Sequence, residues 1–357
     1  MTTTKPKLVF EKVTVAPLWK RTLVLLLALF VTFLVTSGLI IIGGANPLEA
    51  FYYLLVAPLS NRMGALEVLV KTTPLLLAGV AVTFAFTAGY YNIGAEGQLF
   101  AGAIAAAWLG VGLEGFPAVV AIPLMLLGGF VAGMGWALIP ALLRVKWAVD
   151  EVVTTLLLNS VMGYIVSALL NGPWRDPASG WPQSPEIAPA AQFPKLIARS
   201  RLNLGFVIAL LTVLVLWFVT TRTGFGLKMR AVGLGKKAAR FAGVPVERTI
   251  LIAALISGGL AGIVGVAEVA GIQYHLIGDL SPGYGYTGII IATLGGLNAF
   301  GVAGAALFFG LVDTGAQTVS RVLGVPVYLG EVTQAAMLLI TLGMLLLQRY
   351  HIRIRRD

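Results

Sequence analysis

Three polar side chains stand close together in the segment YNIGAEGQLF, residues 91–100, which lies between two apolar stretches. They are Asn92, Glu96 and Gln98, and they flank two glycines. Polar groups at a break between apolar helices need partners, and ionisable residues in such places often serve function. We therefore expect these three residues to line a translocation path or its inner gate. In the alternative, Asn92 and Gln98 cap helix ends and Glu96 pairs with a basic residue.

A second polar group follows in VDEVVTTLLLNS, residues 149–160. Two acids, Asp150 and Glu151, stand at its start, where the dipole of a helix favours negative charge. Thr154, Thr155 and Asn159 then fall within about one and a half turns, with Thr155 and Asn159 on one face. This spacing predicts a polar stripe that faces a pore, and hydrogen bonding between helices explains it equally well.

Residues 222–248 form a basic stretch, RTGFGLKMRAVGLGKKAARFAGVPVER, between two apolar segments. We expect two short helices here, separated near Gly233 and Gly235 and ended by Gly243 and Pro245. Such a rigid basic element could dock an ATPase, although an ordinary loop of the positive-inside kind would look similar. The residues expected to make this contact are Met229, Arg230, Ala231, Val232, Gly233, Lys237, Ala238, Ala239, Arg240 and Gly243.

The stretch itself does not read as a nucleotide site. Its run GLGKKA lacks the GxxxxGK[ST] spacing of a phosphate-binding loop, and no strand precedes it. Any ATP hydrolysis would therefore take place on another chain, and we expect this chain to bind no cofactor and to hold no catalytic residue.

Few other residues could do chemistry. Glu268 and Asp313 lie in or near apolar spans, where each could bind an ion or form a salt bridge. The chain has no cysteine and only two histidines, His275 and His351. A thiolate or histidine metal site and a catalytic triad are therefore excluded as working hypotheses, and no HExxH motif is present.

The composition places these residues in a membrane protein. Hydrophobic residues make up 58% of the 357-residue chain and charged residues only 11%, too little polar surface for a soluble globule. Lys and Arg gather in three places: five before residue 22, seven within 222–248 and four within 349–356. The net charge of +10 therefore reflects cytoplasmic clusters beside apolar spans rather than a nucleic-acid-binding face.

An all-α polytopic fold follows, because a spanning helix needs about 20 apolar residues. Ten spans are predicted, with both the basic N-terminus (1–21) and the basic tail (348–357) in the cytoplasm; eight spans would also fit. They are 22–42, 72–90, 97–113, 118–141, 152–170, 204–220, 250–269, 285–297, 302–319 and 328–347. This arrangement makes 22–347 the transmembrane domain, with an extracytoplasmic loop at 171–203 and a cytoplasmic loop at 222–248.

Glycine shapes several of these spans. The expected spans at 97–113 and 285–297 are short and glycine-rich, which predicts broken or re-entrant elements packed inside protein. The interrupted segments 91–102 and 283–301 lie in opposite halves of the chain, as in transporters with an internal duplication. Gly129 and Gly133, and likewise Gly258 and Gly262, are four residues apart, which favours close helix packing within the chain over an oligomer contact.

Four motifs in order resemble a known family, the permeases of bacterial ABC importers for nucleosides and simple sugars, related to ribose and branched-chain amino-acid permeases. The motifs are YYNIGAEGQLFAG; DEVVTTLLLNSVMGYI followed by NGPWRDP and WPQSP; MRAVGLGKKAARFAGV; and GYGYTGIIIATLGGLNAFG. The chain departs from the family at Leu234–Lys237, where an acidic or Asn-Pro run is common, and at Asn298-Ala299, where Asn-Pro is common. The first departure could alter pairing with a particular ATPase.

The resemblance implies an all-helical importer permease whose loop after the sixth span provides the coupling helices, with the breaks at Asn92–Gln98 and Asp150–Thr155 near the cytoplasmic gate. It also implies the partners: ATPase subunits that bind ATP and magnesium, a second and different permease chain, and an extracytoplasmic substrate-binding lipoprotein. The subgroup with GPWRDP carries chiefly purine nucleosides, with riboflavin as a variation.

The sequence therefore predicts a permease subunit that moves a nucleoside-like solute across the inner membrane, with riboflavin or a simple sugar as other cargoes. The rival is an ion-coupled secondary transporter that acts alone and uses Glu96, Glu268 or Asp313 for protons or sodium. That rival predicts uptake that an ionophore abolishes and that needs no ATPase.

Overall fold

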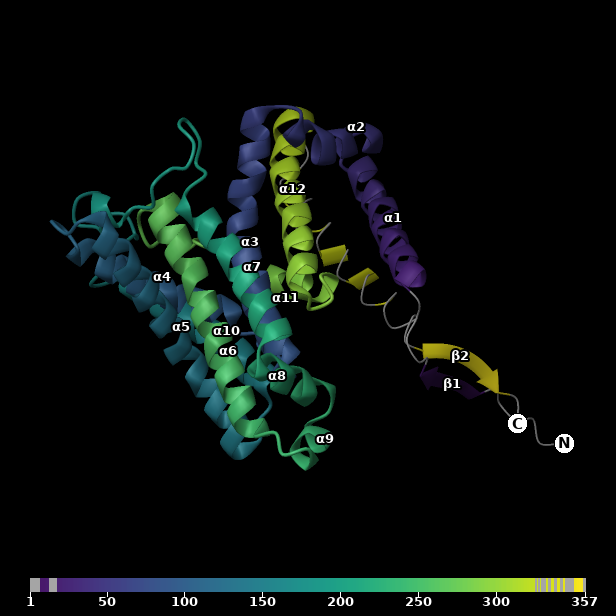
Figure 1. Ribbon diagram of the computed structural model, residues 1–357. Helices are drawn as coiled ribbons and strands as arrows, with labels where there is room; N and C mark the ends of the chain where they lie inside the picture. Colours follow the sequence, from purple (N-terminus) through teal and green to yellow (C-terminus); the bar gives the residue numbers. More distant parts are fainter. Residues whose placement is uncertain are drawn as a thin grey trace. The chain divides into compact units, whose positions relative to one another are not determined.

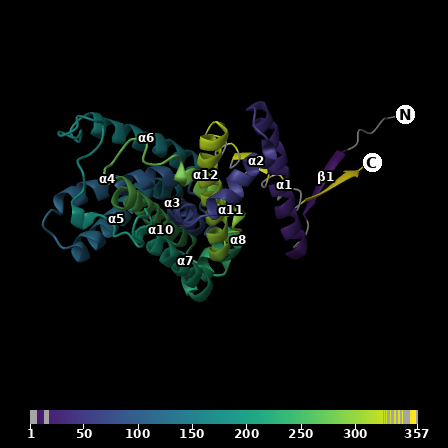
Figure 2. The same cartoon turned by 90° about the horizontal axis from the view of Figure 1, so that it is seen from above.

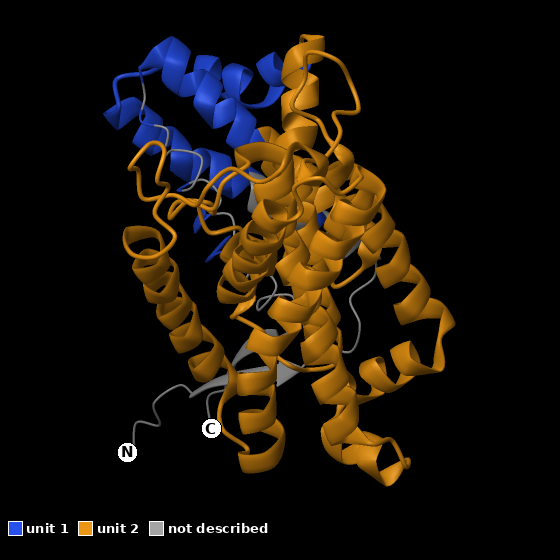
Figure 3. Ribbon diagram, turned by 90° about the vertical axis from the view of Figure 1, so that its left-hand side faces the viewer, with its two compact units in different colours: residues 1–59, 312–357 blue, residues 60–311 orange. Residues whose placement is uncertain are grey.

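The computed structural model describes residues 7–12, 18–324 and 350–355, together with isolated positions between 326 and 343. These residues are mainly helical (Figure 1). The chain divides into two compact units, residues 1–59 with 312–357 and residues 60–311 (Figure 3). The larger unit holds all of the residues that the sequence singled out at 92–98, 150–159 and 229–243.

The larger unit consists of helices in chain order. They are α3 (Arg62–Thr87), α4 (Ala95–Gly112), α5 (Ala118–Trp147), α6 (Glu151–Asn171), the short 3-10 turn η3 (Pro189–Ala191), α7 (Leu204–Arg222), α8 (Gly224–Leu234), α9 (Lys236–Phe241), α10 (Val246–Glu268) with its π-helical extension η4 (Val269–Gln273), α11 (Tyr284–Leu294) and the first part of α12 (Ala299–Leu323). Several begin at an N-cap side chain that accepts a backbone N–H, including Asn61, Asp150 and Thr223.

Helix α10 lies at the centre of this unit and packs against α3, α4 and α5 (Figure 2). The contacts are glycine-lined, as the four-residue spacing predicted. A Cβ atom on Gly262 would lie 2.2 Å from the carbonyl oxygen of Gly129, and one on Gly133 would lie 2.2 Å from that of Gly258. The small residues therefore let the backbones of α5 and α10 touch within one chain, which confirms the intramolecular alternative.

Six helices of the described chain are long and apolar enough to cross a membrane: α3, α5, α6, α7, α10 with η4, and α12. They cover six of the ten expected spans, and α1 and α4 cover two more. Helix α11 covers the expected span at 285–297, but its 11 residues reach only about 16 Å of the roughly 30 Å of a bilayer core. A broken element was predicted there. The last expected span, 328–347, falls almost wholly outside the described residues, so a total of ten is not established.

The smaller unit contains α1 (Leu18–Ile42), α2 (Pro47–Phe51), the short helical turns η1 (Tyr52–Val56) and η2 (Ala57–Leu59), and the last part of α12. Sequence reasoning missed the helical stretch at 47–59. Two strands, β1 (Lys7–Lys12) and β2 (Tyr350–Arg355), pair antiparallel with Lys7 opposite Arg355. These strands are an exception to the all-α prediction. Their backbone pairing joins the two basic ends of the chain.

Candidate functional site

The interrupted segments at 91–102 and 283–301 meet, although almost two hundred residues separate them. Helices α4 and α11 come together at their N-termini, so closely that a Cβ atom on Gly285 would lie 2.3 Å from the backbone nitrogen of Glu96. Around this contact lies a group of polar side chains, which we call the polar junction: Asn92, Glu96, Gln98, Asn159, Ser257 and Tyr286. Two half-helices that meet at their N-termini are typical of transporter binding regions.

Asn92 and Gln98 form a closed pair inside the junction. The Asn92 amide donates to Gln98 Oε1 at 2.8 Å, and the Gln98 amide donates back to Asn92 Oδ1 at 3.0 Å. Asn92 also donates to Ser257 Oγ at 3.0 Å, and Ser257 donates to the carbonyl of Ala81 at 2.6 Å. Ser257 lies midway along α10 and Ala81 lies on α3, so these bonds tie the start of α4 to both helices.

Glu96 connects the two half-helices. Its Oε2 accepts the N–H of Gly285, in the first turn of α11, at 2.7 Å. The N-cap residue of α11 is Gly283, which has no side chain to cap the helix. Ser281 Oγ accepts the N–H of Tyr284 at 2.9 Å, and a carboxylate from another helix accepts the N–H of Gly285. Glu96 is 8% exposed, and in the described part of the chain no basic side chain forms an ion pair with it. Glu96 therefore bonds to a backbone N–H, whereas the alternative interpretation of the sequence predicted a basic side chain as its partner.

Asn159 joins the junction from α6. Its Oδ1 accepts the N–H of Gly97 at 2.9 Å, while its amide donates to the carbonyl of Ile93 at 2.9 Å and to Tyr286 Oη at 3.1 Å. One side chain therefore connects α6, the first turn of α4, α11 and the broken segment, by which we mean residues 88–94 between α3 and α4. A Cβ atom on Gly97 would also lie 3.1 Å from Trp136 Nε1, so this indole of α5 borders the same region.

The threonines of α6 divide between two environments. Thr155 is fully buried, and a Cβ atom on Gly94 would lie 3.0 Å from Thr155 Cβ, so its side chain packs against the broken segment on the same side of α6 as Asn159. Thr154 is half-buried and bonds back to its own helix, to the carbonyls of Asp150 at 2.9 Å and Glu151 at 3.3 Å. The structure therefore brings Thr155, but not Thr154, to the polar junction.

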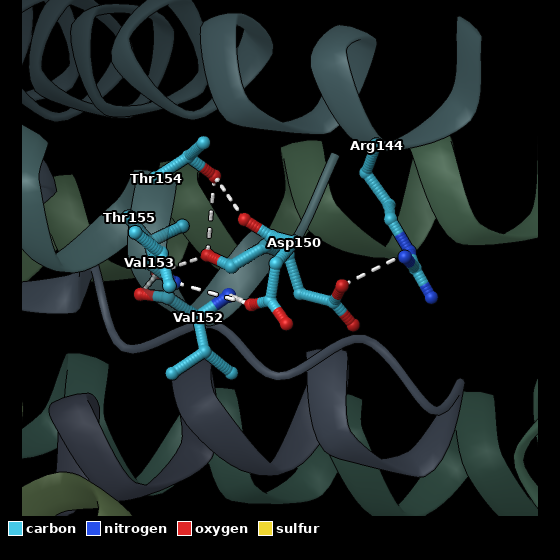
Figure 4. A network of polar contacts seen from close by, with 7 residues as sticks. Arg144, Asp150, Val152, Val153, Thr154 and Thr155 are labelled. Atoms are coloured by element: carbon cyan, nitrogen blue, oxygen red, sulfur yellow. Dashed lines mark hydrogen bonds and ion pairs between the residues drawn. The ribbon is translucent and has the colours of Figure 1, made fainter. Parts of the chain in front are cut away.

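The start of α6 is fixed by its two acids (Figure 4). Asp150 caps the helix, since its Oδ1 accepts the N–H groups of Val152 and Val153 at 2.8 and 3.2 Å. Glu151 pairs with Arg144 at the end of α5, with Arg144 Nε 2.9 Å from Glu151 Oε2. The Glu151 side chain is buried and that of Arg144 is 29% exposed, so this ion pair is a partly buried link between α5 and α6 that sequence reasoning missed.

The basic stretch folds into two short helices, α8 and α9, divided at Gly235 as predicted. Three of the ten expected coupling residues, Met229, Val232 and Ala239, are buried. Ala231 is half-buried, and the remaining six are exposed: Arg230, Gly233, Lys237, Ala238, Arg240 and Gly243. Arg240 forms an ion pair with Glu247 of α10. The two helices thus have an apolar inner face and an outer face that carries basic side chains together with the exposed Leu234 and Phe241.

The inner face of α8 and α9 lies against a buried apolar cluster that contains Tyr90, another residue that sequence reasoning missed. We call it the Tyr90 cluster; its buried members are Ala85, Tyr90, Ala141, Val232, Ala239, Val246, Ile250 and Ala254. Burial raises the pKa of the Tyr90 hydroxyl, and the nearby Glu151 carboxylate adds to the increase. Burial also lowers the pKa of the Lys236 ammonium, with Arg144 contributing. The adjacent tyrosines in YYNIG were the only sequence signal for this cluster.

The remaining candidates lie elsewhere. Glu268 is buried at the end of α10, within electrostatic reach of Lys71 and Arg201, while Asp313 is half-buried on α12. His275 Nδ1 lies 2.8 Å from the carbonyl oxygen of Ser184. The His351 side chain falls outside what the structure describes. Within the described residues, no group of three or more His, Cys, Asp or Glu could hold a metal ion.

Long apolar helices around a polar break define a multi-pass membrane protein, with a pair of basic helices attached to that break. Its family is also established: residues 64–342 match the model described as the permease component of the branched-chain amino acid transport system, and the chain belongs to that family. It is thus a permease component of the ABC transporter type, which confirms the resemblance read from the motifs.

Named relatives extend this result. The chain is 38% identical over 322 residues to the glucose ABC transporter permease protein TsgB13 of Haloferax volcanii, covering 87% of this chain and 84% of that one. It is 34% identical to the guanosine ABC transporter permease protein NupP of Bacillus subtilis, over 76% of this chain and 79% of the relative. A second guanosine permease protein of that organism, NupQ, is 27% identical over 69% and 79% of the two chains. No solved structure matches the chain.

Proposed function

We propose that this chain is one permease subunit of an importer for a nucleoside-like solute or a simple sugar, driven by separate ATPase subunits. The observation that carries the proposal is the attachment of the basic helices α8 and α9 to the broken segment 88–94. The positive-inside rule gives a stand-alone carrier basic cytoplasmic loops, but it does not require that such a loop fold into two helices packed onto the broken segment. The cargo class follows the printed names of the relatives, which include both glucose and guanosine.

In this proposal the polar junction is the part of the pathway that opens and closes. Asn92, Glu96, Gln98 and Asn159 hold the two half-helices together, and Thr155 packs beside them. We place Thr154 on the pathway side of α6, since it is the less buried of the two threonines. Two arrangements of this junction, with different affinities for the cargo and for ATP on the partner, are the minimum that coupled transport requires.

The partners and location belong to the same proposal. The chain would lie in the inner membrane with both termini and α8–α9 in the cytoplasm, in line with the three basic clusters. Residues 171–203 would face outward and receive the substrate-binding lipoprotein. A second, different permease would complete the pathway, since Bacillus subtilis has two guanosine permease proteins that both resemble this chain.

The test is to express the chain with the products of its neighbouring genes, purify it through a tag, and reconstitute the recovered complex into liposomes. We expect an ATPase and a second permease to copurify, and labelled guanosine or glucose to enter only when ATP is supplied on the ATPase side. Uptake by this chain alone, abolished by an ionophore and indifferent to ATP, would instead establish the ion-coupled rival.

A further inference from the structure

Tyr90 stands between the basic helices and the polar junction. It lies two residues before Asn92, and its side chain is 1% exposed. It is the one aromatic residue among the fully buried members of the Tyr90 cluster, which also contains Val232 of α8, Ala239 of α9 and Ile250 of α10. A bulky side chain in a close-packed interior must shift when the elements around it shift.

The backbone next to Tyr90 is in equally close contact with α8. A Cβ atom on Gly233 would lie 2.3 Å from the carbonyl oxygen of Thr87, and one on Gly89 would lie 3.2 Å from the Cα atom of Gly233. The two backbones touch directly, so no side chain lies between them that could absorb a displacement by changing its rotamer. A movement of α8 toward the bundle must therefore be followed by residues 87–90.

From Tyr90 the chain continues into the junction through tight turns. The N–H of Tyr90 donates to the carbonyl of Ala85 at 3.2 Å, and the N–H of Asn92 donates to the carbonyl of Tyr90 at 3.1 Å. The Asn92 side chain then bonds Gln98 and Ser257. A displacement of the Tyr90 backbone consequently reaches the amide pair after two residues.

We propose that Tyr90 is the positioning residue through which α8 and α9 set the geometry of the polar junction. Movement that an ATPase imposes on the two helices is delivered through the Tyr90 ring to Asn92. The inference rests on the proposed function of α8 and α9 as the ATPase contact, and it adds the route by which that contact reaches the pathway. Tyr90 touches no cargo in this scheme.

The test compares Tyr90→Ala with a matched variant, Phe309→Ala. Phe309, on α12, is also completely buried, so its truncation leaves a similar void away from α8 and α9. The complete complex is reconstituted into liposomes, and the readout is the amount of labelled guanosine or glucose imported per ATP hydrolysed. Both variants should lower thermal stability, but only Tyr90→Ala should reduce the import ratio, by roughly 2- to 30-fold for a residue on a coupling route.

Two further variants keep the test decisive. Tyr90→Phe should restore the normal ratio, because the ring makes the contact and the hydroxyl has no hydrogen-bond partner among the described residues. Tyr90→Leu, which fills part of the space, replaces Tyr90→Ala if that variant does not assemble. The role of Tyr90 would be overturned if Tyr90→Ala, or Tyr90→Leu in its place, imported the normal amount of solute per ATP hydrolysed. An equal loss of this ratio in Phe309→Ala would overturn it too. Import without ATP by the unchanged complex would overturn the proposed function as well.

Discussion

Among single residues, Asn159 shows how one amide can organise a broken membrane segment. Both of its polar atoms are used: the oxygen accepts from Gly97, and the nitrogen donates to Ile93 and Tyr286. Backbone groups at a helix break lack the partners that a continuous helix would give them. Asn159 supplies two of those partners from a neighbouring helix, which is why the break can exist inside the bundle.

Asn159→Ala should therefore destabilise the protein and slow transport. It leaves the N–H of Gly97 and the carbonyl of Ile93 without their partner, and each unsatisfied buried group costs about 1–3 kcal/mol. The measurement is the apparent unfolding temperature in detergent together with the uptake rate. Thr154→Ala is the control on the same helix, since among the described residues that hydroxyl bonds only to carbonyls of its own helix, and its unfolding temperature should stay near the original. Equal shifts in both variants would contradict the role given to Asn159.

In contrast to Asn159→Ala, Tyr90→Phe should stabilise the protein. The Tyr90 hydroxyl is buried without a partner among the described residues, so removing it relieves a desolvation cost of about 1 kcal/mol or more. Tyr286→Phe provides the contrast, because that hydroxyl accepts a bond from Asn159. We expect the apparent unfolding temperature to rise for the first variant and to stay level or fall for the second. A drop for Tyr90→Phe would show that the hydroxyl has a partner in solution.

At the scale of helices, the bundle depends on backbones that touch. Gly102 of α4, Gly129 of α5 and Gly262 of α10 meet at one crossing, where an added Cβ atom on any of them would come within 2.2 Å of an atom of a neighbouring helix. Close approach of this kind strengthens van der Waals contact where lipid supplies no hydrophobic force between helices. The crossing also holds α4, and with it the polar junction, against α10.

Gly262→Ala should loosen that crossing. Its Cβ atom would lie 2.2 Å from the carbonyl oxygen of Gly129, which is backbone and cannot rotate away, and such overpacking costs about 1–3 kcal/mol. Gly135→Ala on α5 is the matched control, since nothing lies within 4 Å of the added atom and alanine is the better helix former. Thermal unfolding of the purified protein should show a clear loss for the first and no loss for the second. A loss of the same size in both would mean that helix contact is not the cause.

The sequence was informative about elements and much less so about their meeting points. Apolar length identified the long helices, and glycine placement predicted both the short element at α11 and the division between α8 and α9. Nothing in the spacing of Glu96 could reveal that it caps α11, because that bond joins residues 189 positions apart. The Arg144–Glu151 pair was hidden for a different reason: capping alone already explained an acid at the start of α6. Tyr90 gave no signal beyond the two adjacent tyrosines of YYNIG.

For the whole molecule, the separation of inner and outer faces on α8–α9 allows docking to be tested without damage to the fold. Met229, Val232 and Ala239 anchor the helices, whereas Arg230 and Lys237 are exposed. Replacing the whole stretch 229–240 by a Gly/Ser linker should abolish ATP-coupled uptake while membrane insertion continues, but it removes the anchors too. The double variant Arg230→Glu/Lys237→Glu changes only the outer face.

We expect the double variant to fold normally, with an unchanged unfolding temperature, but to lose capture of its ATPase and with it ATP-driven uptake. Charges at the rim of an interface act mainly on association rate and on salt dependence. Capture of the ATPase, measured by copurification, should therefore also become less sensitive to ionic strength. Lys146→Glu is the matched charge reversal, at the exposed end of α5 outside both basic helices, and it should leave capture near the original level. If Lys146→Glu impairs capture as strongly as the double variant does, the ATPase responds to the overall charge of this side of the protein, and α8–α9 is not its specific docking surface.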